Sequence, residues 1–136
     1  MPRSRFVTPS TRILPLSGGD SITVRDRLTH GETADGFQWM TYLDKDDRDN
    51  PLRTDPRKAR DALVLTYLVD WTFTGPDGTV VPIRGIPRDE LATILSNLDP
   101  LDFAEVYDAV AVHDRGVRQR LIEQKKTAAE NAPALT

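Results

Sequence analysis

The 136-residue sequence predicts a single α+β domain, in which three to four helices pack on a small antiparallel sheet. Three observations support this prediction. Apolar residues recur at helical spacing in four segments, they alternate with polar residues in others, and two Asp-Pro dipeptides mark helix starts. A chain of this length can bury a core without disulfides, and it contains no cysteine to form them.

The composition divides the chain into three parts. We expect an extended arm over residues 1–20, one domain over 21–122 and a polar, frayed tail over 123–136. The arm is rich in Pro, Ser, Thr and Gly. Its short apolar patch, Ile13-Leu14-Pro15-Leu16, could pair at a sheet edge, where proline is tolerated.

The first part of the domain combines a strand and a short helix. The segment SITVRDRL alternates apolar and polar residues, so we expect a strand with one buried face over 22–28. Phe37, Met40 and Leu43 then recur at helical spacing, although Gly36 weakens the helix that they predict. The charged segment 44–55 predicts a solvated loop.

The next helix begins at an aspartate followed by proline, because Asp55 suits the N-cap and Pro56 the first helical position. By Leu63 this helix is apolar on almost every side, which is typical of a buried central helix.

The pattern changes at Asp70, beyond which Trp71 and Phe73 alternate with polar residues. We therefore expect the helix to pass into a short strand there, with Trp71 and Phe73 anchored in the core. Residues 75–78, Gly-Pro-Asp-Gly, predict a turn, after which 79–83 would return antiparallel. The sheet would then combine this hairpin with the strand at 22–28.

Two more helices complete the predicted domain. Pro87 opens the first, and Asp99-Pro100 repeats the cap-and-proline signal at the start of the second. The last helix carries an apolar stripe that ends near Ile122, and its members are Phe103, Val106, Tyr107, Val110, Val117 and Leu121.

The charge balance and the hydropathy exclude several classes of function. A formal net charge of −3 argues against general binding of nucleic acid, which needs a basic face. No segment reaches the roughly 20 apolar residues of a membrane helix, and the N-terminus lacks the apolar stretch of a signal peptide. We expect a soluble, cytosolic protein with no membrane partner.

Few residues are candidates for chemistry. Asp44 and Asp46 have the spacing of a calcium loop, but Arg48 occupies the third ligand position, so a solvated loop is favoured. His30 and His113 lack metal-ligand spacing and are typical of surface or capping residues. Asp70 is either a catalytic carboxylate or, as we favour, a local acceptor for backbone N–H groups. The sequence predicts no catalytic, metal or cofactor residue.

The order of these motifs resembles the tail assembly chaperones of long-tailed bacteriophages. In that family an apolar helix ends in a Val-Asp-Trp-like element, followed by a D-G-x-x-V-P turn, a helix opened by proline and a last helix ending near a histidine. The corresponding residues here extend from about Ser21 to His113. The charged insert 44–55 and the arm 1–19 depart from the family pattern.

The resemblance implies a non-enzymatic protein of the host bacterial cytoplasm. It would bind the helical tape-measure protein, keep it soluble and help tail-tube subunits polymerise around it, itself a monomer or a homo-oligomer. Family members often exist in two lengths through ribosomal frameshifting, and this chain would be the shorter. The alternative is a phage virion structural protein, such as a head–tail joining or tail-completion component.

Two groups of residues are candidates for partner binding. Trp39, Met40 and Tyr42 are large side chains beside the charged loop, and methionine is adaptable at binding surfaces. Their alternative role is in the core. Arg118 and Arg120 belong to a basic cluster that is either a solvated helix face or a docking site for an acidic or helical partner.

Overall fold

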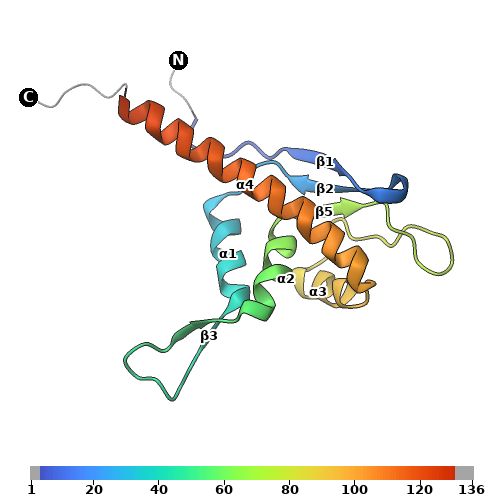
Figure 1. Cartoon of the computed structure of the whole chain (residues 1–136), viewed down its shortest axis with the longest axis horizontal. Helices are drawn as coiled ribbons and strands as arrows, with labels where there is room; N and C mark the ends of the chain where they lie inside the picture. Colours follow the sequence, from blue (N-terminus) through green and yellow to red (C-terminus); the bar gives the residue numbers. More distant parts are fainter. Residues whose placement is uncertain (1–3, 131–136) are drawn as a thin grey trace, which may run out of the picture.

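The computed structural model describes residues 4–130 and has an α+β fold, as the sequence predicts (Figure 1). Four helices accompany a three-stranded sheet and a separate two-stranded hairpin. In chain order the elements are β1 (Thr11–Pro15), the short 3-10 helix η1 (Ser17–Gly19), β2 (Ser21–Arg25), α1 (His30–Met40), β3 (Thr41–Leu43), β4 (Leu52–Thr54), α2 (Pro56–Tyr67), β5 (Leu68–Trp71), α3 (Arg88–Ser96) and α4 (Pro100–Glu130).

The three-stranded sheet is antiparallel and has the order β1-β2-β5. Ile22 and Val24 of the central strand are fully buried, which confirms the expected single buried face. The apolar patch of the arm forms β1 and pairs with β2, with Leu14 opposite Ile22. Residues 11–15 of the predicted arm are therefore an edge strand that is part of the sheet.

Helix α1 is fixed at its start by a capping box. The Thr29 hydroxyl accepts a hydrogen bond from the Glu32 backbone N–H at 3.1 Å, and the Glu32 carboxylate accepts one from the Thr29 N–H at 2.9 Å. The helix ends at Met40. The expected loop at 44–55 is in part wrong, because Leu43 of β3 pairs with Leu52 of β4 in a hairpin that projects from the body (Figure 1).

Helix α2 begins as predicted, with the Asp55 carboxylate accepting a hydrogen bond from the Arg57 N–H at 2.9 Å. It ends at Tyr67, earlier than expected, and β5 follows at Leu68 without a loop. The prediction for 79–83 is in part wrong, because the segment returns antiparallel but forms no strand. Only an isolated Thr74–Val80 bridge forms, and Pro82 has no N–H to extend a ladder.

Two arginines bind the carbonyl groups at the junction of α2 and β5. Arg25 Nη1 donates to the Thr66 carbonyl at 2.6 Å, and Arg88 Nη1 donates to the Leu68 carbonyl at 2.9 Å. Cations at a helix C-terminus also complement its dipole. Burial and the nearby Arg25 charge lower the pKa of Arg88, so this cation is held in place against a desolvation cost.

The last two helices start where the sequence predicts. Pro87 precedes α3, and the Asp99 carboxylate accepts a hydrogen bond from the Leu101 N–H at 2.8 Å at the start of α4. Within the polar tail expected after Ile122, residues 123–130 continue helix α4 and are exposed. Their Glu, Gln, Lys and Ala residues favour helix without burial. Residues 131–136 lie outside the described part of the chain.

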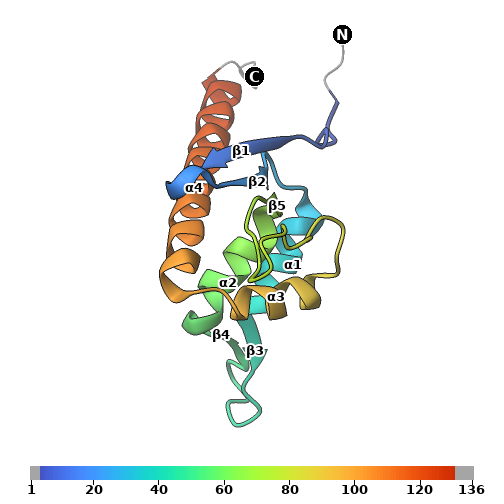
Figure 2. The same cartoon turned by 90° about the vertical axis from the view of Figure 1, so that its right-hand side faces the viewer.

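Helix α4 lies along one side of the molecule, with helices α1, α2 and α3 on its inner side, and the end of β1 and η1 overlap α4 in the view of Figure 2. Its buried residues are Val106, Val110, His113 and Val117. The core combines Val106 and Val110 with residues of β2, α2, β5 and α3. Residues 118–130 are all exposed, so the C-terminal end of α4 extends beyond the core.

Helices α1 and α2 approach each other closely at Gly36, which explains a glycine inside a helix. A Cβ atom at position 36 would overlap the Thr66 hydroxyl, which itself donates to the Ala62 carbonyl at 2.7 Å. We expect Gly36→Ala to destabilise the fold by about 2 kcal/mol, through overpacking. Chemical denaturation measures this difference directly.

Gly116 provides a matched control, because it is also helical but a Cβ atom added there would meet no other atom within 4 Å. Gly116→Ala should stabilise the protein by up to about 1 kcal/mol through helix propensity alone. Thr66→Ala should relieve much of the Gly36→Ala penalty in the double variant. Additive effects of the two changes would contradict the close contact.

Trp71 joins the sheet to the following loop. Its side chain is 4% exposed, its indole N–H donates to the Val81 carbonyl at 2.8 Å, and its ring lies 4.9 Å from that of Phe73. We expect Trp71→Ala to lower the free energy of unfolding by about 3–5 kcal/mol. Trp71→Phe, which loses the N–H but keeps an aromatic ring, should lose less. Equal losses would contradict the packing role.

Candidate binding groove between α1, α2 and α4

A groove of about 350 Å³ lies where α1, α2 and α4 meet. Most of its wall is apolar, and one end is polar. Its lining residues are Leu28, Thr33, Gly36, Phe37, Met40, Ala59, Ala62, Leu63, Thr66, Tyr67, Asp114 and Arg118.

The close contact of α1 and α2 shapes this groove. Because Gly36 sits against Thr66, the next residue, Phe37, lies at the groove wall and remains 47% exposed. Met40 follows one turn later on the same side of α1. The groove therefore presents a large aromatic and a flexible thioether side chain to solvent.

The polar end of the groove is a hydrogen-bonded chain of three side chains. The Tyr67 hydroxyl donates to Asp114 Oδ1 at 2.7 Å, and Arg118 Nε lies 2.9 Å from Asp114 Oδ2. Burial, followed by the hydrogen bond to Asp114, raises the pKa of Tyr67 above its ordinary value, so this group stays a neutral donor. Arg118 is 72% exposed and leaves its charge at the mouth of the groove.

His113 lies beneath this chain and is 6% exposed, so its expected surface or capping position is wrong. Its Nε2 atom lies 2.8 Å from the Arg25 carbonyl oxygen, and its ring meets that of Tyr67 edge-on at 5.4 Å. The imidazole thus joins α4 to the end of β2. This is a structural contact in the core.

The structure brings together two of the five residues predicted to bind a partner. Met40 and Arg118 both line the groove. Trp39 is half-buried against the core, which confirms its alternative role. Tyr42 is exposed on β3, where it lines a separate shallow hollow with α2 residues.

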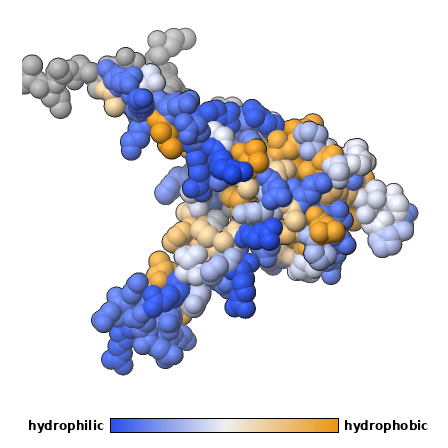
Figure 3. Space-filling model, viewed as in Figure 1, coloured by the Kyte–Doolittle hydropathy of each residue, from blue (hydrophilic) through white to orange (hydrophobic). Residues whose placement is uncertain are grey.

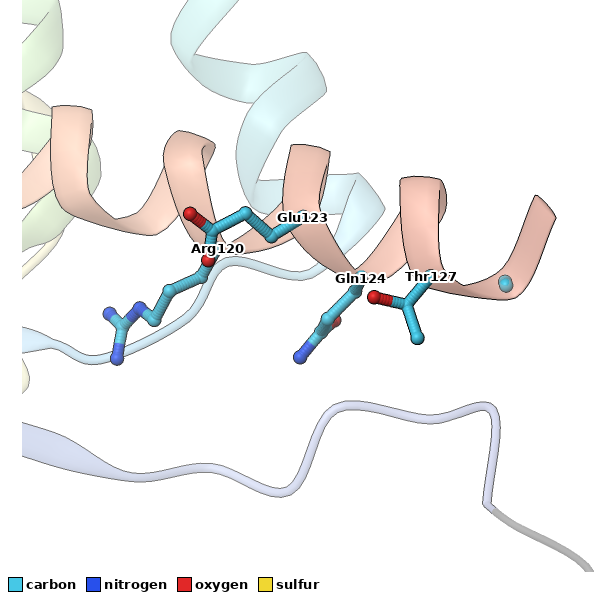
Figure 4. Close-up of a pocket in the computed structure, with 5 residues that line it drawn as sticks. Arg120, Glu123, Gln124 and Thr127 are labelled. Carbon is cyan, nitrogen blue, oxygen red and sulfur yellow. The ribbon is translucent and has the colours of Figure 1, made fainter. Parts of the chain in front are cut away.

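Arg120 lies away from the groove, on the projecting end of α4. Arg120, Gln124 and Thr127 extend to one side of this helix and line an open hollow of about 500 Å³ (Figure 4). The Arg120 guanidinium lies 3.9 Å from Asp26 Oδ1, and Arg12 Nε of β1 lies 3.5 Å from the same oxygen. Arg120 therefore contacts the residue that directly follows β2.

The sequence did not identify Phe37, Leu63, Tyr67 or Asp114 as site residues. The spacing of Phe37 and Met40 was a usable signal, since it places both on one face of α1. Tyr67 and Asp114 carried no such signal, because they are 47 positions apart and meet only through the packing of α2 on α4.

The remaining candidates for chemistry have local partners. Asp70 accepts a hydrogen bond from the Trp71 N–H at 2.9 Å, which confirms a role as a backbone acceptor, and its other oxygen lies 3.2 Å from Arg84 Nε. In the hairpin, Arg53 contacts both Asp44 and Asp47. Within residues 4–130 no group of three or more His, Asp or Glu side chains is arranged to hold a metal ion.

Comparisons with protein-family models, with curated proteins and with solved structures found no match for this chain. Within the described part of the chain, no helix has both the length and the apolarity needed to cross a membrane.

The raised pKa of Tyr67 predicts a specific loss of stability in alkali. The folded state holds the phenolic proton more tightly than the unfolded chain, whose pKa is near 10.0, so stability is unaffected by this group below pH 10 and falls as the pH rises beyond it. At pH 7 Tyr67→Phe should cost about 1 kcal/mol through the lost hydrogen bond. The difference between the two proteins should shrink above pH 10 in denaturation curves. A constant difference would contradict the prediction.

Proposed function

We propose that this chain is a bacteriophage tail assembly chaperone that binds the tape-measure protein without catalysis. The order of its sequence motifs is the reason for naming this family. The observation that carries a binding role is the groove between α1, α2 and α4, which leaves Phe37 half-exposed beside Met40.

The groove has the chemistry of a site for an amphipathic helix. Such helices lay spaced apolar side chains into an apolar groove, and a flexible methionine lets the wall adapt to different side chains. Tape-measure proteins are long and largely helical, so one groove could engage similar segments in turn. Arg118 at the mouth would favour a segment with an acidic residue beside its apolar anchors.

The contacts at the polar end of the groove favour a binding role over a catalytic role. The Asp114 carboxylate is held by Tyr67 and Arg118, and the Tyr67 hydroxyl is committed to that contact. These groups position one another and leave the apolar wall as the main contact surface. In this proposal the protein acts in the host bacterial cytoplasm, where it would also bring tail-tube subunits to the tape-measure protein.

Co-expression with the tape-measure protein of the same genome tests the proposal. The chain should raise the soluble fraction of the tape-measure protein, and the two should co-purify. Phe37→Asp, which places a charge in the apolar wall, should reduce the co-purified amount at least several-fold. Val80→Asp is the matched control, because Val80 is 51% exposed but lies in the isolated bridge to Thr74 and does not line the groove.

Equal losses for Phe37→Asp and Val80→Asp would place the client elsewhere, and no effect of the chain on tape-measure solubility would defeat the proposal. Mass spectrometry of purified virions tests the alternative. A tail assembly chaperone should be absent from the finished particle, whereas a head–tail joining or tail-completion component should be present in stoichiometric amounts.

A further inference from the structure

The outer face of α4 carries apolar residues that the rest of the described chain leaves uncovered. Val112 and Ile122 are 61% and 62% exposed. They lie on the side of α4 opposite the buried Val106, Val110 and Val117. Figure 2 shows α4 at the edge of the molecule, and Figure 3 shows hydrophobic residues interrupting an otherwise hydrophilic surface along it.

Six exposed residues form one row along this outer face, at alternating spacings of four and three. They are Asp108, Val112, Arg115, Gln119, Ile122 and Lys126. A repeat of 3.5 residues keeps one seam of a helix in contact with a second helix. The row is acidic at its beginning and basic at its end, so it is complementary to itself when the two helices run in opposite directions.

We propose that α4 pairs antiparallel with α4 of a second copy of this chain through this row. With the twofold axis at the height of residue 117 along the outer face, Val112 lies opposite Ile122 of the partner subunit, and Asp108 lies opposite the partner's Lys126. Arg115 then faces the partner's Gln119. The symmetry makes each of these contacts twice.

Other arrangements lose this complementarity. A shift of one heptad in either direction places Val112 opposite the partner's Arg115, or Arg115 opposite the partner's Lys126. A parallel pair places Asp108, Arg115 and Lys126 each opposite its own copy. The first shift sets an apolar side chain against a cation, and the second shift and the parallel pair bring like charges together, which opposes pairing. The charge pattern therefore selects a single register.

The shape of the molecule permits this contact. The row spans about 27 Å of helix, and the core of each copy lies on the inner side of its own α4, away from the second helix. The end of β1 and η1 flank the beginning of the row, where Leu16 and Ser17 line an open hollow with Asp108 and Val112, and the Ser17 N–H donates to Glu105 at 3.0 Å. The pairing goes beyond the proposed function and does not require it, because the groove residues Asp114 and Arg118 are not in the row.

Charge reversal tests the pairing and its direction. Sedimentation equilibrium of the full chain should show a reversible dimer. Lys126→Asp and Asp108→Lys should each raise the dissociation constant roughly tenfold or more, because two attractive pairs become repulsive. The double variant D108K/K126D should restore the dimer. A wild-type monomer at every concentration, or single variants that dimerise like wild type, would overturn the proposal.

Cysteine cross-linking gives an independent readout, because the chain has no native cysteine. A mixture of Val112→Cys and Ile122→Cys chains should form a disulfide-linked dimer on mild oxidation, and neither variant alone should do so. Cross-linking of either variant with itself would indicate parallel pairing and overturn the register. Circular dichroism confirms that each variant is folded, and Phe37→Asp, in the groove, should dimerise like wild type.

Discussion

A helix and a strand meet without a loop at Tyr67 and Leu68, and the rest of the structure depends on how this junction is stabilised. A helix that ends inside a core leaves carbonyl groups without intrahelical partners, and burying them unpaired is costly. Arg25 from β2 and Arg88 from the start of α3 donate to the carbonyls of Thr66 and Leu68. These hydrogen bonds satisfy the two carbonyl groups and at the same time hold β2 and the start of α3 against the junction.

The same junction determines the geometry of the groove. Tyr67 is the last residue of α2, and its hydroxyl reaches Asp114 of α4 while its ring meets His113. His113 in turn contacts the carbonyl of Arg25, whose side chain binds the end of α2. Together these contacts fix α2 against α4, so the side chains at the polar end of the groove also stabilise the fold.

The sequence predicts the parts of the fold that depend on local chemistry. Asp55 and Asp99 cap the helices they were expected to cap, since an N-cap needs only a side-chain oxygen within a few residues of the free N–H groups. The end of α2 was less predictable. The apolar run from Leu63 to Val69 suits either a buried helix or a buried strand, and the pairing with β2 decides where one becomes the other.

Contacts between distant segments explain the other differences. His113 looked like a surface residue because its partners, Arg25 and Tyr67, lie far away in the sequence. Met40 and Arg118 were predicted in separate groups, and only the packing of α1 and α4 on α2 brings them into one groove. The β3–β4 hairpin was missed because its strands are three residues each, too short for alternation to be visible.

The two ends of helix α4 are stabilised in different ways. Up to Val117 its inner face is fixed by burial. Beyond that residue every side chain is exposed, and the helix depends on propensity and on the ion pairs of Arg118 with Asp114 and of Arg120 with Asp26. Isolated helical segments of this length are only marginally stable in water. A second helix along the outer face would therefore do more than join two copies. It would also hold residues 118–130 helical, and with them the position of Arg118 at the mouth of the groove, so client binding and pairing would be coupled through a helix that both surfaces share.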